Sequence, residues 1–228
     1  TTKANTVHDG ASVNGAIPAV VPTSGGARQV RGILVSNGEV RRYSTTGSVA
    51  VTGGQAFANT VPCVFSAQNG LNLFFADGTT YKYYQSSTDS VIAFTPTSGV
   101  LPVDTQAQKA RLICTWNGRL VYSGLLNDPA NWFMSKQNDP FNWNYSPATT
   151  TVQQAVAGNV SRLGLVGDYV TSLVPYADDT LIFGCVHSLW MCQGDPMNGG
   201  SIIRISGELG MAWGRAWCID PYNQLYFF

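Results

Sequence analysis

The chain has few charged residues. Lys and Arg together number 13, Asp and Glu also number 13, and charged side chains make up 11% of the 228 residues. An average soluble protein carries roughly 25%. A formal net charge of zero leaves little Coulombic attraction for nucleic acid or for an anionic membrane. It also removes the repulsion that keeps isolated proteins apart, which suits a subunit inside an assembly.

Residues and motifs for catalysis are also scarce. With only His8 and His187, a Ser-His-Asp or Cys-His arrangement has few candidates, and no Gly-x-Ser-x-Gly elbow occurs. Glycoside hydrolysis needs two carboxylates facing a sugar-binding cleft. The aspartates stand mostly in turn contexts, and the sequence singles out no such pair. We therefore expect the chain not to be an enzyme.

The five cysteines are too scattered for a disulfide framework. Cys185, His187 and Cys192 are three conceivable zinc ligands, but their spacing fits no common zinc finger and a fourth ligand is not evident. The simpler interpretation is a set of buried thiols that act as small hydrophobic side chains. No metal and no cofactor is expected.

Long apolar runs are absent from the sequence. None approaches the roughly 20 residues that cross a bilayer, so no membrane-spanning segment is expected. Residues 1–5 lack the apolar core of a signal peptide. The chain starts without Met and stops inside an apolar, strand-like stretch at 225–228. A free apolar strand end is an aggregation hazard, so these ends predict a fragment of a longer polypeptide.

Turn residues and strand formers are plentiful instead. There are 24 Gly and 11 Pro, and hydrophobic residues reach 44%, too many for a disordered chain. Asn37-Gly38 and Asp77-Gly78 each stand between two apolar or alternating runs. Such pairs favour tight hairpins because both residues accept positive φ. The sequence therefore predicts an all-β protein.

The hairpin pattern recurs along the chain. Five positions are equivalent in this scheme: Leu34, Phe74, Val121, Ile182 and Tyr226. The steps between them are 40, 47, 61 and 44 residues. Periods of roughly 40 to 50 residues with three or four strands indicate β-propeller blades, which stack and protect their edges by repetition.

We therefore expect residues 1–228 to form a single β-propeller region, which is incomplete and belongs to a larger propeller. The blade-like repeats are expected at about 20–60, 61–104, 110–165, 170–207 and, truncated, 211–228. A β-sandwich built from the same hairpins is the alternative architecture.

Residues 126–145 contain nearly the same five-residue sequence twice, at 128–132 and at 139–143. The two copies are called the doubled motif below. The segment lies between the second and third strands of the third repeat, where the first two repeats use short turns. Each Asp-Pro pair starts a turn, and each Trp covers apolar surface and needs one partner for its N–H. An enlarged, pinned loop is predicted. Its candidate interaction residues are Asp128, Pro129, Asn131, Trp132, Asp139, Pro140, Asn142 and Trp143.

Two further groups of side chains allow a binding interpretation. The six tryptophans could form sugar-stacking platforms, but their strand neighbours favour buried packing between repeats. Arg28, Arg31, Arg41 and Arg42 cluster near the first hairpin and could form a basic edge that faces DNA or a neighbouring subunit. A solvated strand face is the simpler interpretation of these arginines.

A set of motifs in the second half of the chain resembles a known family. They are the strand 119–123, Asn127-Asp128-Pro129, the run 132–135, Asn138-Asp139-Pro140 with Trp143, and the run 181–183 leading to Ser188-Leu189-Trp190 and Gly194-Asp195-Pro196. Over about residues 110 to 200 this pattern resembles the tail nozzle proteins of short-tailed bacteriophages, also called tail tubular protein B or tail hub proteins. Asn138 stands where that family is expected to have glycine.

The resemblance implies a structural virion protein of the phage tail that contains a β-propeller. It implies a ring, a hexamer, that surrounds the DNA-ejection conduit below the portal. The implied partners are copies of the chain itself, tail adaptor proteins, and tail fibres or spikes. DNA would pass without sequence-specific binding.

Two other function classes compete with this expectation. One is a carbohydrate-binding or glycan-cleaving β-propeller, such as a receptor-binding fibre head, which requires exposed tryptophans beside paired carboxylates. The other is a host scaffold propeller of the WD type. The Gly-His and Trp-Asp pairs expected of such a scaffold are missing from the sequence.

Overall fold

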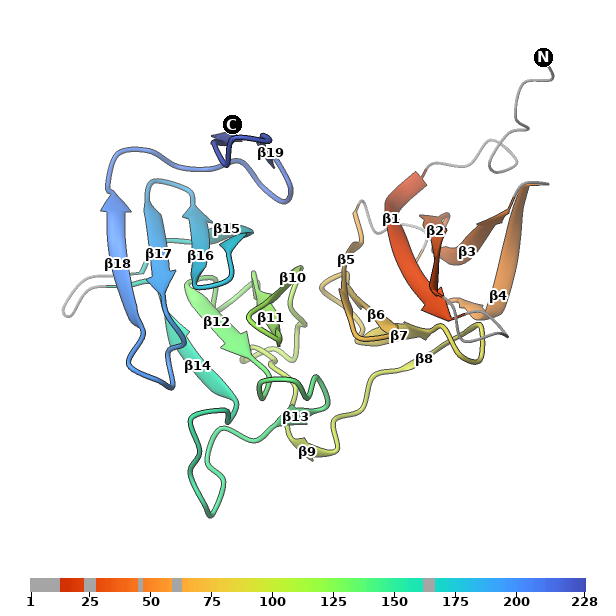
Figure 1. The fold of residues 1–228 in the computed structure, drawn as a ribbon, viewed down its shortest axis with the longest axis horizontal. Helices are drawn as coiled ribbons and strands as arrows, with labels where there is room; N and C mark the ends of the chain where they lie inside the picture. The colour runs from red at the N-terminus through yellow and green to blue at the C-terminus, as the bar shows by residue number, and fades with distance from the viewer. Residues whose placement is uncertain (1–12, 23–27, 45–46, 59–62, 162–166) are drawn as a thin grey trace. The chain divides into compact units, whose positions relative to one another are not determined.

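The computed structural model describes residues 13–22, 28–44, 47–58, 63–161 and 167–228, which form strands, turns and loops without a helix (Figure 1). The prediction of an all-β chain is confirmed for these residues. Nothing in this part of the chain is a helix long and apolar enough to cross a membrane. The chain divides into two compact units, Thr1–Phe94 and Thr95–Phe228, which are described separately.

The first unit contains two antiparallel meanders of four strands each. The first meander consists of β1 (Val13–Pro22), β2 (Arg28–Ser36), β3 (Glu39–Ser44) and β4 (Gly47–Gln55). The second consists of β5 (Phe65–Asn69), β6 (Asn72–Ala76), β7 (Lys82–Gln85) and β8 (Ser90–Ala93). Together they form one sheet in the order β1-β2-β3-β4-β8-β7-β6-β5.

The tight turns of this unit follow from residues that accept positive φ. Asn37 (φ 50°) and Gly38 (φ 76°) connect β2 to β3, as a type I′ turn requires. Between β5 and β6 the turn is Gly70-Leu71, because Asn69 already pairs with Asn72. The hairpin lies one residue later than the Asn-Gly pair alone suggests.

The connection from β6 to β7 is longer than the predicted two-residue turn. Asp77-Gly78 opens a loop, and β7 begins only at Lys82. The buried Asp77 carboxylate explains the shift, since its Oδ1 accepts hydrogen bonds from the N–H groups of Thr79 (2.8 Å) and Thr80 (2.7 Å). An aspartate that bonds the following backbone in this way holds residues out of the strand.

Two contacts nearly close the eight-stranded sheet. Thr52 of β4 pairs in parallel with Ser90 of β8. At the other end of the strand order, the Gln68 side chain of β5 bonds Val20 of β1 twice. Its Nε2 donates to the Val20 carbonyl, and its Oε1 accepts from the Val20 N–H, both at 2.8 Å. A side-chain amide offers the same donor and acceptor as a peptide group, so Gln68 replaces backbone pairing between β5 and β1.

The apolar core of the first unit lies between its two meanders. Ile33 and Val40 come from the first meander, and Leu73, Phe75 and Tyr84 come from the second; all are buried in one cluster. Successive strand residues point to opposite faces, so these positions line the inner face of each meander. The meanders therefore pack face to face.

A charged cluster borders this core. Arg31 and Arg42 each stand two residues from a core position, and both approach the Asp89 carboxylate, at 3.8 Å and 2.7 Å. Tyr84 donates its hydroxyl to Asp89 at 2.7 Å. Burial is the main cause that raises the pKa of Tyr84 to about 12. Arg31 and Arg42 therefore form ion pairs while their side chains stay 24% and 30% exposed.

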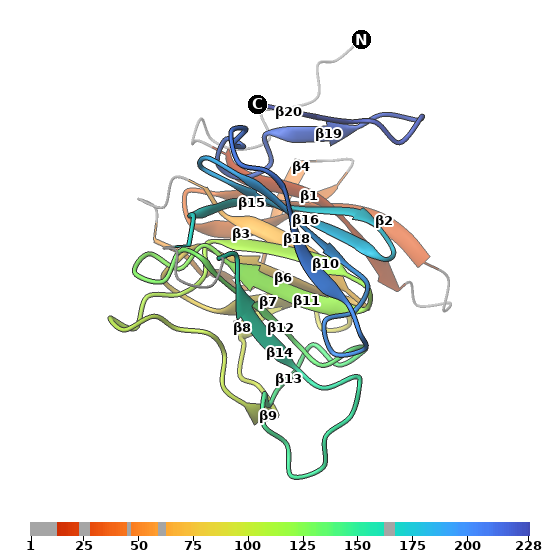
Figure 2. The ribbon, with the colours of Figure 1, turned by 90° about the vertical axis from the view of Figure 1, so that its left-hand side faces the viewer.

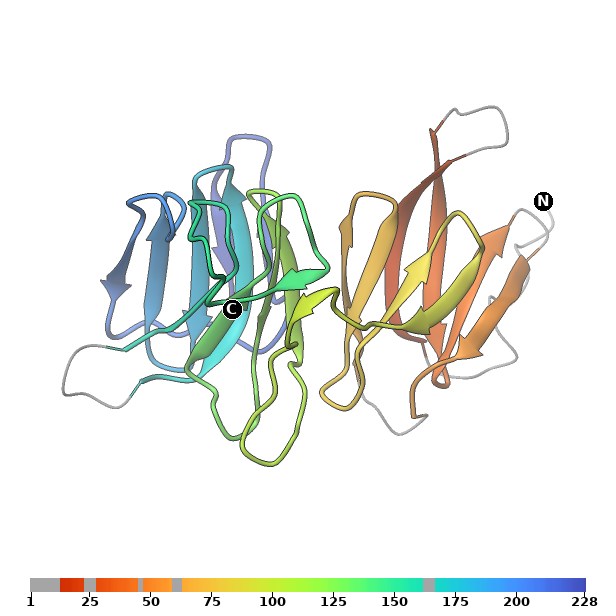
Figure 3. The same ribbon diagram turned by 90° about the horizontal axis from the view of Figure 1, so that it is seen from below.

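The second unit contains two separate four-stranded sheets. One consists of β10 (Leu112–Trp116), β11 (Arg119–Ser123), β12 (Asn131–Met134) and β14 (Val156–Asn159). The other consists of β15 (Val170–Ala177), β16 (Thr180–Cys185), β17 (Leu189–Gln193) and β18 (Ser201–Ser206), drawn in cyan to blue in Figure 3. Neighbouring strands in both sheets are antiparallel.

Two small sheets complete this unit. β9 (Ser98–Gly99) pairs in parallel with β13 (Asn142–Trp143). β19 (Trp217–Ile219) pairs with β20 (Leu225–Phe227), and both strands are labelled in Figure 2. The β19–β20 hairpin packs on a core of Val174, Ile182, Leu189 and Met211.

Candidate functional site

The first half of the doubled motif forms a turn that joins two sheets. Asp128 and Pro129 are half-buried, and the Asp128 carbonyl accepts a hydrogen bond from Asn131 N–H at 3.2 Å. The Pro129 carbonyl accepts from the N–H of Val170, the first residue of β15, at 2.9 Å. The Asn131 carbonyl accepts from Ser123 Oγ at 2.7 Å. The polar groups of this half therefore hold β12 beside its neighbours.

The Trp132 side chain lies between sheets. It is 3% exposed, and its ring centroid lies 5.8 Å from that of Phe183 in β16. Across the ladder it faces Gly158 of β14, where an added Cβ would overlap the indole ring. Trp132 Nε1–H is buried without a hydrogen-bond partner in the described residues. Such an unmet donor destabilises a fold by about 1–3 kcal/mol.

The second half of the motif is a pinned turn. Asp139 Oδ1 accepts from Phe141 N–H at 3.1 Å, and the Asp139 carbonyl accepts from Asn142 N–H at 3.3 Å. Trp143 is fully buried, and its Nε1–H donates to the Pro140 carbonyl at 2.8 Å. The Trp143 ring packs 5.5 Å from an aromatic ring of β11. Both tryptophans of the motif thus serve as internal anchors.

The segment before β10, which contains Thr97 and Asp104, also bonds this loop. Thr97 N–H donates to the Phe141 carbonyl at 2.8 Å. Asp104 Oδ2 accepts from both the N–H (3.0 Å) and the side-chain amide (2.7 Å) of Asn127. Burial would raise the pKa of Asp104, but the hydrogen bonds from Gln108 and Asn127 outweigh it and lower the pKa. A charged carboxylate therefore holds the start of the loop.

Arg119 is a fully buried side chain at the first position of β11. Its Nε and Nη2 bond the two oxygens of Asp195 at 2.8 Å and 3.0 Å. Nη1 donates to the carbonyls of Ser135 (2.8 Å) and Gln154 (2.7 Å). Asp195 also accepts from Met197 N–H at 2.9 Å. One guanidinium thus fixes the end of β12, the returning loop and the β17–β18 turn.

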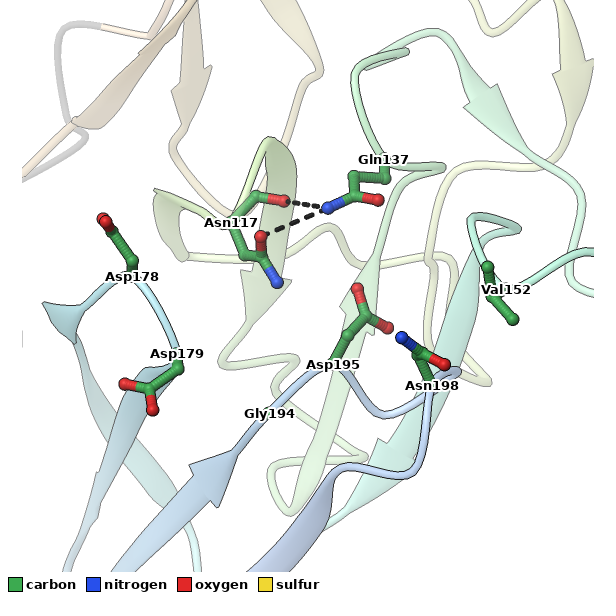
Figure 4. A pocket seen from close by; sticks show the side chains of 8 residues that line it. All are labelled: Asn117, Gln137, Val152, Asp178, Asp179, Gly194, Asp195 and Asn198. Carbon is green, nitrogen blue, oxygen red and sulfur yellow. Dashed lines mark hydrogen bonds between the residues drawn. The ribbon is translucent and has the colours of Figure 1, made fainter.

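Asp195 also lines an open pocket of about 380 Å³ (Figure 4). Its lining comes from the turns at one end of the two sheets: Asn117, Gln137, Val152, Asp178, Asp179, Gly194, Asp195 and Asn198. Gln137 Nε2 donates to the Asn117 carbonyl at 3.2 Å. Asp178 and Asp179 are exposed at the β15–β16 turn.

The chemistry of the pocket is that of a polar, acidic depression. The Asp195 charge is balanced by Arg119, which leaves Asp178 and Asp179 as its acidic edge. In the described part of the chain, no three Cys, His, Asp or Glu side chains group as metal ligands. The pocket offers hydrogen-bond acceptors, and it presents no nucleophile next to a base.

Ser188, His187 and Asp168 are also grouped, though outside this pocket. Ser188 Oγ donates to Asp168 Oδ2 at 2.7 Å and accepts from Trp190 Nε1 at 2.9 Å. His187 is 82% exposed, with Nδ1 3.6 Å from Asp168 Oδ1. Burial raises the pKa of Asp168, but hydrogen bonds from Ser188 and His187 outweigh it and lower the pKa. A weakly basic carboxylate bonded directly to the hydroxyl is a structural contact.

The three residues that the sequence offered as zinc ligands point to different environments. Cys185 and Cys192 are fully buried, whereas His187 lies at the surface. Burial raises the pKa of each thiol to about 12. A thiol in this state is an inert core group.

Sequence reasoning identified the turns of the doubled motif but missed Arg119 and Asp104 as the residues that fix it. A signal for Arg119 exists in the sequence, because a charge opens the otherwise apolar strand after Asn117-Gly118. Its partner Asp195 is 76 residues away, and no local pattern connects the two.

The chain matches no protein-family model, and no curated protein is similar to it in sequence. Among solved structures, the extracellular domain assigned to a one-component system of B. thetaiotaomicron superposes with a TM-score of 0.55 at 12% identity. The match covers 93% of this chain and 25% of that one.

Two extracellular domains assigned to hybrid two-component systems of the same bacterium also align with the chain. Their TM-scores are 0.49 and 0.47, at 9% and 12% identity; each match covers 95% of this chain and 30% and 27% of theirs. The chain thus spans about a quarter to a third of these structures. At such identities, only the match at TM-score 0.55 bears on the fold, and it supports a β-rich fold alone.

Proposed function

We propose that the chain is a structural subunit of a phage tail nozzle, a ring whose walls form the DNA-ejection conduit. The observation that carries the proposal is the buried Arg119–Asp195 ion pair. It joins the two segments whose motifs resemble nozzle proteins, 119–147 and 179–200. The residues that carry the resemblance to nozzle proteins pack in the core or form turns, which supports a structural role.

A β-propeller is the architecture we propose for this subunit. Four antiparallel meanders support it, at residues 13–55, 65–93, 112–159 and 170–206. Within each unit, two meanders pack face to face. A single β-sandwich uses two sheets in total, whereas blades repeat the same four-stranded module.

The mechanism we propose is geometric. Face-to-face meanders give a stiff wall, and the loop at 124–146 supplies contacts to neighbouring subunits, adaptor proteins or fibres. Its tryptophans hold the loop from inside, while Leu126 is 52% exposed at its start. The near-zero net charge suits a conduit, because a strongly basic wall would bind the phosphates of passing DNA.

Electron microscopy of virions that carry this polypeptide tests the proposal. We expect density for a ring of six copies below the portal, with the chain placed in the ring wall. An antibody against residues 124–146 should label the tail. Finding the native polypeptide only as a free monomer in host cytosol would contradict the proposal.

The competing carbohydrate-binding function required exposed tryptophans. Trp132 and Trp143 are 3% and 0% exposed, so neither offers a face on which a sugar ring can stack. The acidic pocket has no tryptophan in its lining. We therefore do not propose a glycan-binding role for this loop.

A further inference from the structure

The turn between β17 and β18 contains an Asn-Gly pair. Asn198 and Gly199 are exposed, and the Asn198 side chain lines the pocket of Figure 4. The nitrogen of a glycine can attack the side-chain amide carbon of a preceding asparagine, because glycine has no Cβ that obstructs the approach. This reaction needs an unbonded asparagine side chain, an unbonded glycine N–H and a peptide unit that can rotate.

Neither reacting group of this pair is bonded. Among the described residues, none forms a hydrogen bond with the Asn198 side chain or with the Gly199 N–H. The neighbouring bonds lie on either side, since the N–H groups of Asn198 and Gly200 both donate to the Asp195 carbonyl, at 2.9 Å and 2.8 Å. A Cβ added to Gly199 would meet nothing within 4 Å. The peptide unit between Asn198 and Gly199 can therefore rotate without breaking a hydrogen bond.

The other Asn-Gly pairs are held by the structure around them. They stand at 14–15, 37–38, 69–70 and 117–118. Gly15 pairs with Val35 inside the β1–β2 ladder, and Asn69 pairs with Asn72 at the end of the β5–β6 ladder. The Gly38 carbonyl accepts two backbone N–H groups from the segment after β4. Rotation at these pairs disturbs a ladder or a bonded turn.

Asn117-Gly118 offers the sharpest comparison, because Asn117 lines the same pocket as Asn198. Gln137 Nε2 donates to the Asn117 carbonyl and to Asn117 Oδ1, each at 3.2 Å. The Gly118 carbonyl accepts from Asn138 N–H at 2.8 Å. Ring closure at Asn117 must first break the two bonds from Gln137, which should slow it about tenfold relative to an unbonded pair.

We propose that Asn198 is a modification site at which the chain deamidates and isomerises without an enzyme. Hydroxide removes the proton of Gly199 N, which then forms a bond to Asn198 Cγ. The bond from Cγ to Nδ2 breaks, and ammonia leaves. Water opens the resulting cyclic imide at one of its two carbonyls. One opening gives aspartate, and the other gives isoaspartate, in which the main chain runs through the former side chain.

Isoaspartate adds a methylene group to the main chain of a turn that has no spare room. A Cβ added to Gly200 would overlap the carbonyl oxygen of Gly194, so the two ends of the turn are in contact. The turn also positions the Asp195 carboxylate, which accepts from Met197 N–H at 2.9 Å and holds Arg119. A longer main chain therefore loosens the buried ion pair. The aspartate product adds a charge to the pocket but leaves the main chain unchanged.

Storage of the 228-residue chain in mildly alkaline buffer, followed by trypsin digestion and mass spectrometry, tests the proposal. Trypsin releases peptides 163–204 and 112–119, in which Asn198 and Asn117 are the sole asparagines. We expect the mass gain of deamidation to accumulate about tenfold faster in 163–204 than in 112–119. Storage in heavy-oxygen water should label the product, because water opens the imide. The rate should rise with pH, because Gly199 N must lose its proton.

Two variants test the cause of the difference. Gln137→Ala removes both bonds to Asn117 and should speed deamidation in peptide 112–119 about tenfold, with little change in 163–204. Asn198→Gln keeps a neutral amide on a longer side chain, which closes a ring far less readily, so peptide 163–204 should gain no mass. Circular dichroism confirms that each variant is folded.

The stability of stored protein tests the effect on the ion pair. Urea unfolding followed by tryptophan fluorescence should show a second, weaker transition in the stored parent chain. Its amplitude should follow the isoaspartate content, measured with an isoaspartate-specific methyltransferase. Asn198→Gln stored alongside should keep a single transition, and freshly prepared Asn198→Asp should unfold close to the parent.

Three outcomes would overturn the inference. They are equal deamidation rates at Asn117 and Asn198, an unchanged rate at Asn117 in Gln137→Ala, and isoaspartate that forms without a weaker transition. All three measurements use the isolated chain, so a missing ring in virions would contradict the proposed function and leave this inference untouched.

Discussion

The two units build the same four-stranded meander but join their meanders differently. In the first unit the junction is an apolar core bordered by Arg31, Arg42 and Asp89, whose side chains are 24–32% exposed. In the second unit the junction includes Arg119 and Asp195, at 0% and 10% exposure. Solvent screens the charges of the first cluster, so its ion pairs contribute little to stability. In the second unit, loss of either partner leaves an uncompensated buried charge, which destabilises the fold strongly.

The largest expected effect comes from breaking the buried pair. Asp195→Ala leaves the Arg119 guanidinium without its carboxylate, and removal of one partner of a buried pair typically destabilises by about 3–5 kcal/mol. All six tryptophans lie in the second unit, so urea unfolding followed by tryptophan fluorescence reports on that unit. Asp179→Asn, on the exposed rim of the same pocket, is the control and should shift stability by less than about 0.5 kcal/mol.

Alkaline pH should weaken the second unit before the first. Burial raises the pKa of Cys114, Cys185 and Cys192 from 9.0 to about 12. It raises that of Tyr84, in the first unit, from 10.0 to about 12. A group with a raised folded pKa stabilises below its unfolded pKa, and this contribution is lost as the pH rises to the folded value.

The tryptophan-detected unfolding midpoint should therefore begin to fall near pH 9. The protection of the β7 amides, which is the ratio of the intrinsic to the observed exchange rate, should fall only above pH 10. Cys114→Ala should reduce the pH dependence of the tryptophan-detected midpoint. Tyr84→Phe should reduce the pH dependence of amide exchange in β7. Equal pH profiles for the two units would contradict this difference.

Gln68 supplies two hydrogen bonds that link β5 to β1. Gln68→Leu removes both hydrogen bonds to Val20 and leaves two backbone groups of β1 without partners, which should destabilise the first unit by about 1–2 kcal/mol. Faster hydrogen exchange of the Val20 amide measures the effect. Gln193→Leu, at an exposed strand end of the second unit, should leave that exchange unchanged.

The smallest expected effect separates the two tryptophans of the doubled motif. Trp143→Phe loses the hydrogen bond to the Pro140 carbonyl, whereas Trp132→Phe removes an N–H that has no partner. Trp143→Phe should therefore destabilise the second unit by about 1 kcal/mol more than Trp132→Phe. Thermal unfolding of both variants measures the difference, and a larger loss for Trp132→Phe would contradict the assigned contacts.

The sequence by itself determined the local structure. Positive φ at Asn37-Gly38 and at Asn117-Gly118 places tight turns where those pairs stand, because the conformational preference belongs to the residues themselves. The Asp-Pro turns of the doubled motif follow for the same reason. Even here a neighbouring interaction can move a boundary, as the Asp77 carboxylate does at β7. The role of the loop in binding neighbouring subunits stays a prediction.

Only the tertiary structure decided which distant residues meet. Gln68 and Val20 are 48 residues apart, and Arg119 and Asp195 are 76 apart. Alternation along a strand states which residues share a face but not what covers that face. The burial of Trp132 and the exposure of Ile203 depend on whether a further sheet packs there, which is a property of packing and not of any local stretch.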